Sequence, residues 1–190
     1  MKKIQSNLVT LHVLAITVMW LAAACSLQAA LTPGETTVPH LDQITSAVSS
    51  GSKEDLLSLF KFSSLPCTKA EGMGGPPKCL ADEAEGTLVE VLPILGPEGH
   101  HIRRSEMSSW PGIGDAQLYA AYRNSKSTYS DEFFPAGDYG IAFVMPDKVD
   151  GVVFQVTEEG IVRLDYQMLS TIDEIIKNSE VIVGPKPPSK

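Results

Sequence analysis

The sequence contains little positive charge and no long basic segment. Its 190 residues include 15 Lys and Arg against 23 Asp and Glu, for a formal net charge of −8. The basic residues that do cluster are Arg103-Arg104 and the tail lysines Lys186 and Lys190. Proteins that bind nucleic acid neutralise a run of phosphates with many Lys and Arg side chains. The composition therefore excludes nucleic acid as a partner and indicates an acidic surface.

The sequence also lacks the common catalytic motifs. It contains no Gly-x-Ser-x-Gly, His-Glu-x-x-His or Cys-x-x-Cys pattern, and these motifs mark nucleophile elbows, zinc-protease helices and dithiol redox sites. His100-His101 is the strongest metal candidate, but neighbouring side chains of an extended chain point to opposite sides. We therefore expect no metal and no cofactor. The remaining catalytic candidates are His40, His100 and Asp165.

Only three cysteines are present. Cys67 and Cys79 bracket a loop rich in glycine and proline, which can form neither a helix nor a central strand. In an oxidising compartment an even pair at short separation predicts a disulfide, whereas a reducing compartment would leave two free thiols. Closing a loop of this length would stabilise the fold by about 3 kcal/mol.

The N-terminal segment, residues 1–24, has the layout of an export signal. Lys2 and Lys3 supply a positive start, residues 8–24 include no Asp, Glu, Lys or Arg, and small residues precede Cys25. This order is typical of a secretory signal peptide. A membrane-spanning helix needs about 20 apolar residues, so the stretch is short for one, although an uncleaved signal that anchors the protein stays open. Cleavage would remove two lysines and no acid, which lowers the formal net charge from −8 to −10.

Two cleavage sites fit this segment. Ala22-Ala23-Ala24 before Cys25 resembles a bacterial lipobox, in which the cysteine is lipidated and becomes the new N-terminus, although Leu21 lies one place further away than the lipobox leucine. The second site is Leu27-Gln28-Ala29 before Ala30, for ordinary signal peptidase. Both predict a protein exported to the bacterial cell envelope or beyond it. The first also predicts membrane attachment through a lipid on Cys25.

Outside the signal, the sequence predicts one domain. Residues 25–38 are interpreted as a flexible linker of the kind that follows a signal or a lipid anchor. Residues 39–178 have the length of a single domain with its own core. Residues 179–190 contain three prolines and are predicted as a tail.

Helices precede strands in this domain. Apolar residues at helical spacing predict a helix over 40–48, and Ser52 is placed to cap a second helix that ends near Pro66. The expected later elements are a strand over 86–95, a short helix over 115–122, a central strand over 139–145, a hairpin over 152–166 and a final helix with a Thr171–Glu174 capping box. This order predicts an α+β domain whose N-terminal helices pack on one face of a curved antiparallel sheet.

Two parts of the domain resemble NTF2-like (SnoaL-like) or cystatin-like α+β domains. One is the helix pair broken at Ser50-Gly51-Ser52, and the other is the closing hairpin 152–166 with its Glu159-Gly160-Ile161-Val162-Arg163-Leu164 turn. The Cys67–Cys79 loop and the segment 93–112 depart from that family's pattern, and the loop is similar to one in uncharacterised bacterial envelope proteins. The NTF2-like resemblance implies a cone-shaped cavity that holds a small apolar ligand.

Aromatic residues indicate where a ligand or a partner would bind. Tyr129, Phe133 and Phe134 belong to a predicted loop, where exposed rings would line a pocket or contact a partner. Packing of these rings into the core is the alternative. The residues expected at the cavity that the resemblance implies are Phe143, Phe154 and Leu164.

The sequence favours a non-catalytic exported protein that binds a small apolar ligand or another protein. The export signal, the predicted disulfide and the missing catalytic motifs support this interpretation. The alternative is a small hydrolase or isomerase on the same scaffold. That function would require His40, His100 or Asp165 to meet within hydrogen-bond reach inside a cleft.

Overall fold

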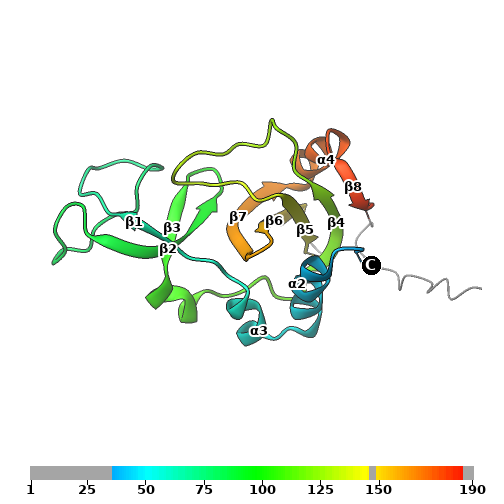
Figure 1. Ribbon diagram of the computed structural model, residues 1–190, viewed down its shortest axis with the longest axis horizontal. Coiled ribbons are helices and arrows are strands. Elements are labelled where there is room, and N and C mark those ends of the chain that lie inside the picture. Colours follow the sequence, from blue (N-terminus) through cyan, green and yellow to red (C-terminus); the bar gives the residue numbers. More distant parts are fainter. Residues whose placement is uncertain (1–35, 146–148, 186–190) are drawn as a thin grey trace, which may run out of the picture. The chain divides into compact units, whose positions relative to one another are not determined.

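The computed structural model describes residues 36–145 and 149–185, which belong to one compact unit, Gly34–Lys190. The predicted signal peptide, Cys25 and most of the predicted linker lie outside the described residues. The described helices are α2 (Pro39–Ser50), α3 (Lys53–Ser58) and α4 (Leu169–Lys177), with a 3₁₀ helix at Arg104–Ser109. The described strands are β1 (Ser63–Pro66), β2 (Leu88–Leu95), β3 (His100–Arg103), β4 (Gln117–Arg123), β5 (Tyr139–Val144), β6 (Asp150–Thr157), β7 (Gly160–Met168) and β8 (Glu180–Val183) (Figure 1).

The two N-terminal helices begin where the spacing and the caps predict them. α2 has Pro39 in its first turn and ends before Gly51, whose φ of 68° is easily adopted only by a residue without a side chain. The Ser52 hydroxyl accepts a hydrogen bond from the Asp55 N–H at 3.2 Å and caps α3. Within residues 36–145 and 149–185, no helix has the length and the hydrophobicity needed to cross a bilayer.

The second helix is shorter than predicted. α3 ends at Ser58 instead of near Pro66. The residues that follow bond to the sheet instead: the Lys61 N–H donates to the Ile161 carbonyl at 2.8 Å, and β1 pairs with β2. Backbone pairing with a distant strand therefore replaces the helical hydrogen bonds that local spacing indicated.

The end of the domain also differs from the prediction. α4 begins at Leu169 without a side-chain cap, so Thr171 and Glu174 lie inside the helix and form no capping box. The predicted tail begins with a strand, since β8 pairs antiparallel with β4 at the edge of the sheet. Val181, Ile182 and Val183 are β-branched residues that suit a strand, and their partner strand is distant in the sequence.

The strands form one mixed sheet in the order β1-β2-β7-β6-β5-β4-β8, with β3 paired to β2. Between the described strands, all the pairings are antiparallel except that of β2 with β7, which is parallel and joins Ile94 to Leu164 and Leu95 to Asp165. The predicted antiparallel sheet is therefore wrong at this one junction, because two strands far apart in the sequence meet there. The α+β class, the strand over 86–95, the central strand and the hairpin are confirmed.

The predicted short helix over 115–122 is wrong, because this segment forms β4. Ala120, Ala121 and Tyr122 are all completely buried, so the segment has no polar face that would reveal a period of two. A short apolar run of this kind fits a buried strand as well as a helix. Pairing with β5 on one side and β8 on the other decides between them.

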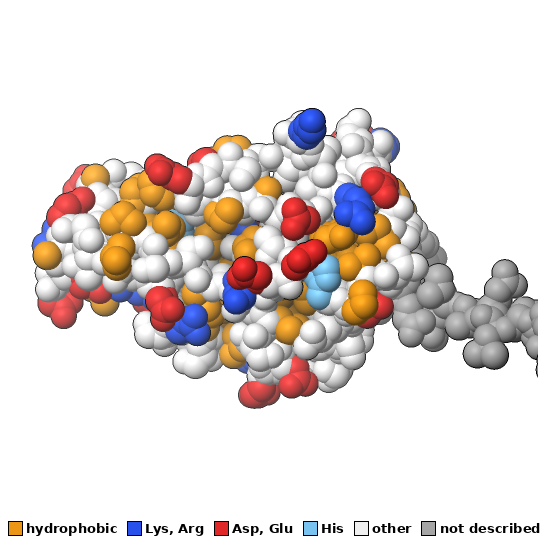
Figure 2. All heavy atoms as spheres, in the orientation of Figure 1, with side chains coloured by type: hydrophobic (Ala, Val, Ile, Leu, Met, Phe, Trp, Pro, Cys, Tyr) orange, Lys and Arg blue, Asp and Glu red, His pale blue; other side chains and the backbone are white. Residues whose placement is uncertain are grey.

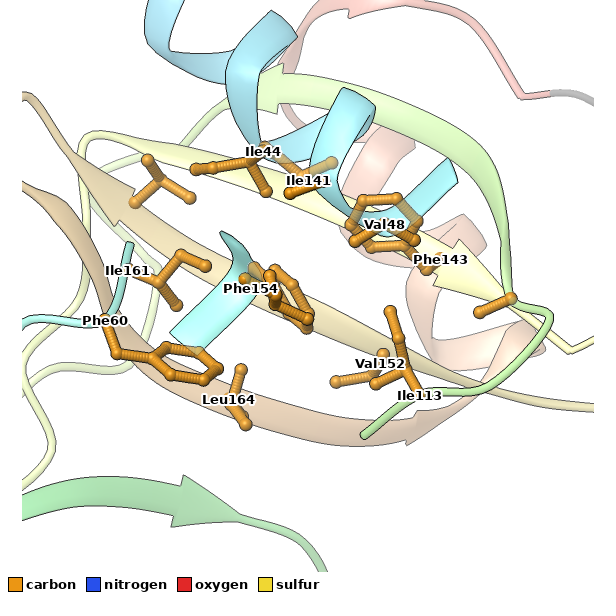
Figure 3. Close-up of a cluster of buried hydrophobic side chains, with 14 of the residues drawn as sticks. Ile44, Val48, Phe60, Ile113, Ile141, Phe143, Val152, Phe154, Ile161 and Leu164 are labelled. Atoms are coloured by element: carbon orange, nitrogen blue, oxygen red, sulfur yellow. The ribbon is translucent and has the colours of Figure 1, made fainter. Parts of the chain in front are cut away.

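Different elements cover the two faces of the sheet. On one face, α2 and α3 pack on β5, β6 and β7, and Phe154 lies in the middle of that apolar cluster (Figure 3). On the other face, Ile172 and Ile176 of α4 pack against Ala142 and Val153. The long connection between β4 and β5 crosses this second face to reach β7 (Figure 1).

The predicted disulfide is present. Cys67 and Cys79 are bonded, with their Cα atoms 4.9 Å apart, and they close the loop between β1 and β2. Cys67 is buried against Val89 and Val91 of β2. The Arg103 guanidinium of β3 donates to the Lys78 carbonyl at 2.9 Å, so a hydrogen bond also holds this loop beside β3.

We predict that reduction of the disulfide lowers the free energy of unfolding by about 3 kcal/mol, because it frees the unfolded chain from a closed loop. Urea unfolding of the purified protein with and without a reductant measures this loss. The Cys67→Ala/Cys79→Ala variant is the control and should not respond to the reductant. An intact mass that does not rise by two hydrogen atoms on reduction would contradict the bond.

Candidate binding site

The three catalytic candidates lie in different places. His40 is on α2, where its ring packs edge-on against Tyr139 with the ring centroids 5.3 Å apart, on the face that α2 covers. His100 is exposed on β3, with Nδ1 3.5 Å from the Glu98 carbonyl oxygen. Asp165 is buried on the opposite face of the sheet from α2. The structure therefore does not bring these side chains into one cleft.

The predicted histidine pair is also divided. His101 is partly buried, and its Nε2 donates to the Phe133 carbonyl at 3.2 Å, whereas His100 is exposed. Burial lowers the pKa of His101. The two rings thus have different surroundings and do not share a ligand position.

One group of described residues places three potential metal-ligand atoms within 4.8 Å of one another: Cys67, Cys79 and Glu83. The two sulfurs are bonded to each other. The Glu83 carboxylate accepts hydrogen bonds of 2.7 and 2.6 Å from Arg103, and this pairing lowers the pKa of Glu83. In the oxidised protein these side chains hold the disulfide loop in place, and neither cysteine is a free thiolate that could bind a metal.

Asp165 belongs to a buried ion pair with Arg163. The Arg163 Nε and Nη2 atoms donate to the two carboxylate oxygens at 2.6 and 2.9 Å. The side chains are only 2% and 8% exposed, respectively. Arg163 Nη1 also donates to the backbone carbonyls of Tyr129 and Phe134, at 3.0 and 2.6 Å. The arginine therefore binds the β4–β5 connection to the second face of the sheet.

Amide groups extend this network to the ends of the connection. Gln155 donates to Asp165 at 2.8 Å, and its Oε1 accepts from Asn124 Nδ2 at 2.6 Å and from the Gly137 N–H at 3.3 Å. A Cβ atom at Gly137 would lie 2.3 Å from the Val156 backbone nitrogen, so the chain approaches β6 more closely than a side chain allows. The network thus holds the connection against the sheet, and both Asp165 carboxylate oxygens accept hydrogen bonds within it.

The predicted aromatic loop has one exposed ring. Tyr129 is 56% exposed and its hydroxyl donates to Asp131, which lowers the pKa of that carboxyl. Phe134 is buried and packs on His101, with ring centroids 4.9 Å apart, while Phe133 is half-buried. Most of this loop therefore packs onto the domain.

The residues expected to line a cavity lie mainly in the solid core. Phe154 and Leu164 are completely buried and Phe143 is 1% exposed, and Figure 3 shows the three packed with aliphatic side chains from both the helices and the strands. Of the three, Phe143 also lines a pocket, which opens at the end of its strand. The apolar pocket thus lies beside the core and not inside it.

This strand-end pocket has a cavity volume of about 350 Å³. It opens where β5 ends, β6 begins and β7 ends. Its described lining residues are Pro97, Phe143, Met145, Asp150, Gly151, Val152, Tyr166, Gln167 and Met168. Pockets that hold small molecules are concave, mainly apolar and start at about 300 Å³. The size and the lining therefore suit a small ligand.

The floor of the strand-end pocket follows from the strand register. Val152 is opposite Phe143 on one side and Tyr166 on the other, so these three side chains share the face that α2 covers elsewhere. Two residues further along, Asp150 is opposite Met168 on the same face. Tyr166 and Met168 are 39% and 61% exposed. The apolar face of the sheet thus continues past its helical cover.

A second cavity, of about 340 Å³, lies between the disulfide loop and β3. This disulfide cleft is lined by Met73, Lys78, Leu80, His100 and Arg103, among others. Met73 and Leu80 are 69% and 49% exposed, and Figure 2 shows hydrophobic side chains gathered at this end of the unit, with acidic groups around them. Its lining combines apolar surface with basic side chains and the acidic side chain of Glu106.

No family model matches this sequence, and no curated protein or solved structure matches it. The site is therefore argued from its own residues. Sequence patterns did not single out Met145, Asp150, Tyr166 or Met168 as site residues. One signal in the sequence could have found them. The face of the hairpin that carries Val152 and Leu164 continues along β7 with Tyr166 and Met168, beyond the part of the sheet that the helices cover.

We predict that Asp165→Asn lowers the free energy of unfolding by about 3–5 kcal/mol, because it leaves the Arg163 charge buried without its counter-charge. Urea unfolding measures the loss. The matched control, Glu159→Gln, breaks the exposed pair of Lys61 and Glu159, whose atoms are 3.3 Å apart, and should cost about 1 kcal/mol or less. Equal losses in the two variants would contradict a structural role for the buried pair.

Proposed function

We propose that the protein is an exported, non-catalytic binding protein that holds a small apolar ligand in the strand-end pocket. The observation that carries this proposal is the shape and lining of that pocket. Side chains that lie opposite one another on β5, β6 and β7 form two adjacent rows, and these rows line a mainly apolar hollow at the edge of the packed core. A cavity of about 350 Å³ accepts one small molecule.

Export is the second part of the proposal. The disulfide supports it, because such bonds persist in oxidising compartments outside the cytosol. The layout of residues 1–24 supports it independently. The NTF2-like resemblance stays a hypothesis of fold, and the ligand proposal does not depend on it, because the strand-end pocket lies beside the sheet core.

A protein partner remains a second candidate. The exposed side chains of Met73, Leu80 and Leu88 favour it, because all three are carried by or next to the disulfide loop, and 49–69% of each is accessible. Clusters of exposed apolar side chains are typical of interaction surfaces. This surface is separate in sequence and fold from the strand-end pocket, so the two candidates are independent.

We predict that the neutral fluorophore N-phenylnaphthylamine binds the purified protein saturably and that Met168→Gln weakens this binding roughly threefold or more. The substitution removes apolar contact area, at about 25 cal/mol per Å², from an exposed position that contributes little to folding. Val181→Gln on β8, where the side chain is 44% exposed, is the control and should leave the affinity unchanged. Absence of saturable binding, or equal effects of the two variants, would contradict the ligand proposal.

We also predict that protein isolated from the cell lacks the N-terminal signal. Mass spectrometry of the N-terminal peptide distinguishes a diacylglycerol on Cys25 from a free N-terminus at Ala30. Either product supports export and selects one of the two cleavage sites. A mature protein in the cytosol that still begins at Met1 would contradict it.

A further inference from the structure

We infer that the ligand of the strand-end pocket is an organic cation: an amine whose positive charge lies beside Asp150 and whose apolar body covers Phe143, Val152 and Met168. This inference rests on the proposed function and specifies its ligand class. It follows from the place of one carboxylate within an otherwise apolar lining.

Register places Asp150 in that lining. It pairs with Met168 across β6 and β7, and Val152, two residues along the strand, pairs with Tyr166. Side chains two residues apart on a strand share a face. The Asp150 carboxylate therefore stands at the rim of the same apolar face as Val152 and Met168, within reach of a ligand that lies on them.

The charges at the pocket rim and on the chain as a whole determine which ligands the pocket attracts. Asp150 is the one charged residue among the described lining residues. Within residues 36–145 and 149–185, no ion pair involves it. The chain as a whole has a formal net charge of −8, and an acidic surface raises the local concentration of cations. An anionic ligand would be repelled both by the Asp150 carboxylate and by the net negative charge of the chain.

The other side chains of the pocket suit the same ligand class. Tyr166 is aromatic and 39% exposed, and aromatic ring faces attract cations. The Trp110 Nε1 atom donates to the Tyr166 hydroxyl at 3.4 Å and orients that ring. Met145 and Met168 are flexible, polarisable side chains that adapt to an alkyl or aryl body.

The disulfide cleft provides an internal contrast. The disulfide cleft is similar in volume, at about 340 Å³, but charges of both signs line it: Lys78, Arg103 and Glu106 contribute, and Arg103 is paired with Glu83. In the strand-end pocket the one charged residue of the described lining is Asp150, which takes part in no ion pair among the described residues.

Three probes that differ only in their head group test the inference: phenylbutylamine, phenylbutanol and phenylbutyrate, a cation, a neutral alcohol and an anion at pH 7. Affinities for the full mature chain are measured by displacement of N-phenylnaphthylamine. We expect the amine to bind roughly threefold to tenfold more tightly than the alcohol, the range for a partly exposed charge pair, and the anion to bind most weakly. Asp150→Asn should remove the advantage of the amine over the alcohol.

Glu180→Gln is the matched control. It removes one negative charge at an exposed position on β8, so it tests whether the preference comes from the net charge of the chain. The amine should keep its advantage in this variant. Equal binding of amine and alcohol to the wild type, or equal losses in Asp150→Asn and Glu180→Gln, would overturn the inference while the apolar pocket stands. Failure of all three probes to bind would overturn the proposed function itself.

Discussion

The architecture of the second sheet face depends on one buried ion pair, Arg163 with Asp165. A guanidinium that is almost completely removed from water must have all its N–H groups paired. Asp165 pairs two of its nitrogens, and the backbone carbonyls of Tyr129 and Phe134 pair the third. The same charge therefore stabilises β7 and fixes the β4–β5 connection. Gly137 is required there because the connection lies against the β6 backbone.

As a result, different elements cover the two faces of the sheet. The polar network and α4 cover the second face, and α2 and α3 cover the first. The helical cover of the first face stops short of the ends of β5, β6 and β7, where Val152, Tyr166 and Met168 continue the apolar rows. The strand-end pocket thus forms because the strands extend beyond the helices that cover this face. The core beside the pocket is fully packed.

Local patterns predicted the parts of this fold that local physics determines. The stripe of α2, the Ser52 cap, the alternation of β6 and β7 and the Cys67–Cys79 bond need only near neighbours in the sequence. The parts that were wrong or missing depend on distant pairing: β4, β8 and the parallel contact of β2 with β7. The buried pair of Arg163 and Asp165 depends on distant packing in the same way. Alternation puts both side chains on one face of a strand, and the segment that covers them is about 30 residues away in the sequence.

Methyl NMR of protein with labelled methionines tests the central claim most directly, because the six methionines include probes of both cavities. Met145 and Met168 line the strand-end pocket, Met73 lines the disulfide cleft, and Met107 is buried in the core. On titration with phenylbutylamine the account predicts saturable shifts of the Met145 and Met168 methyl signals and unchanged signals from Met73 and Met107. Shifts confined to Met73, or no saturable shift of Met168, would contradict it.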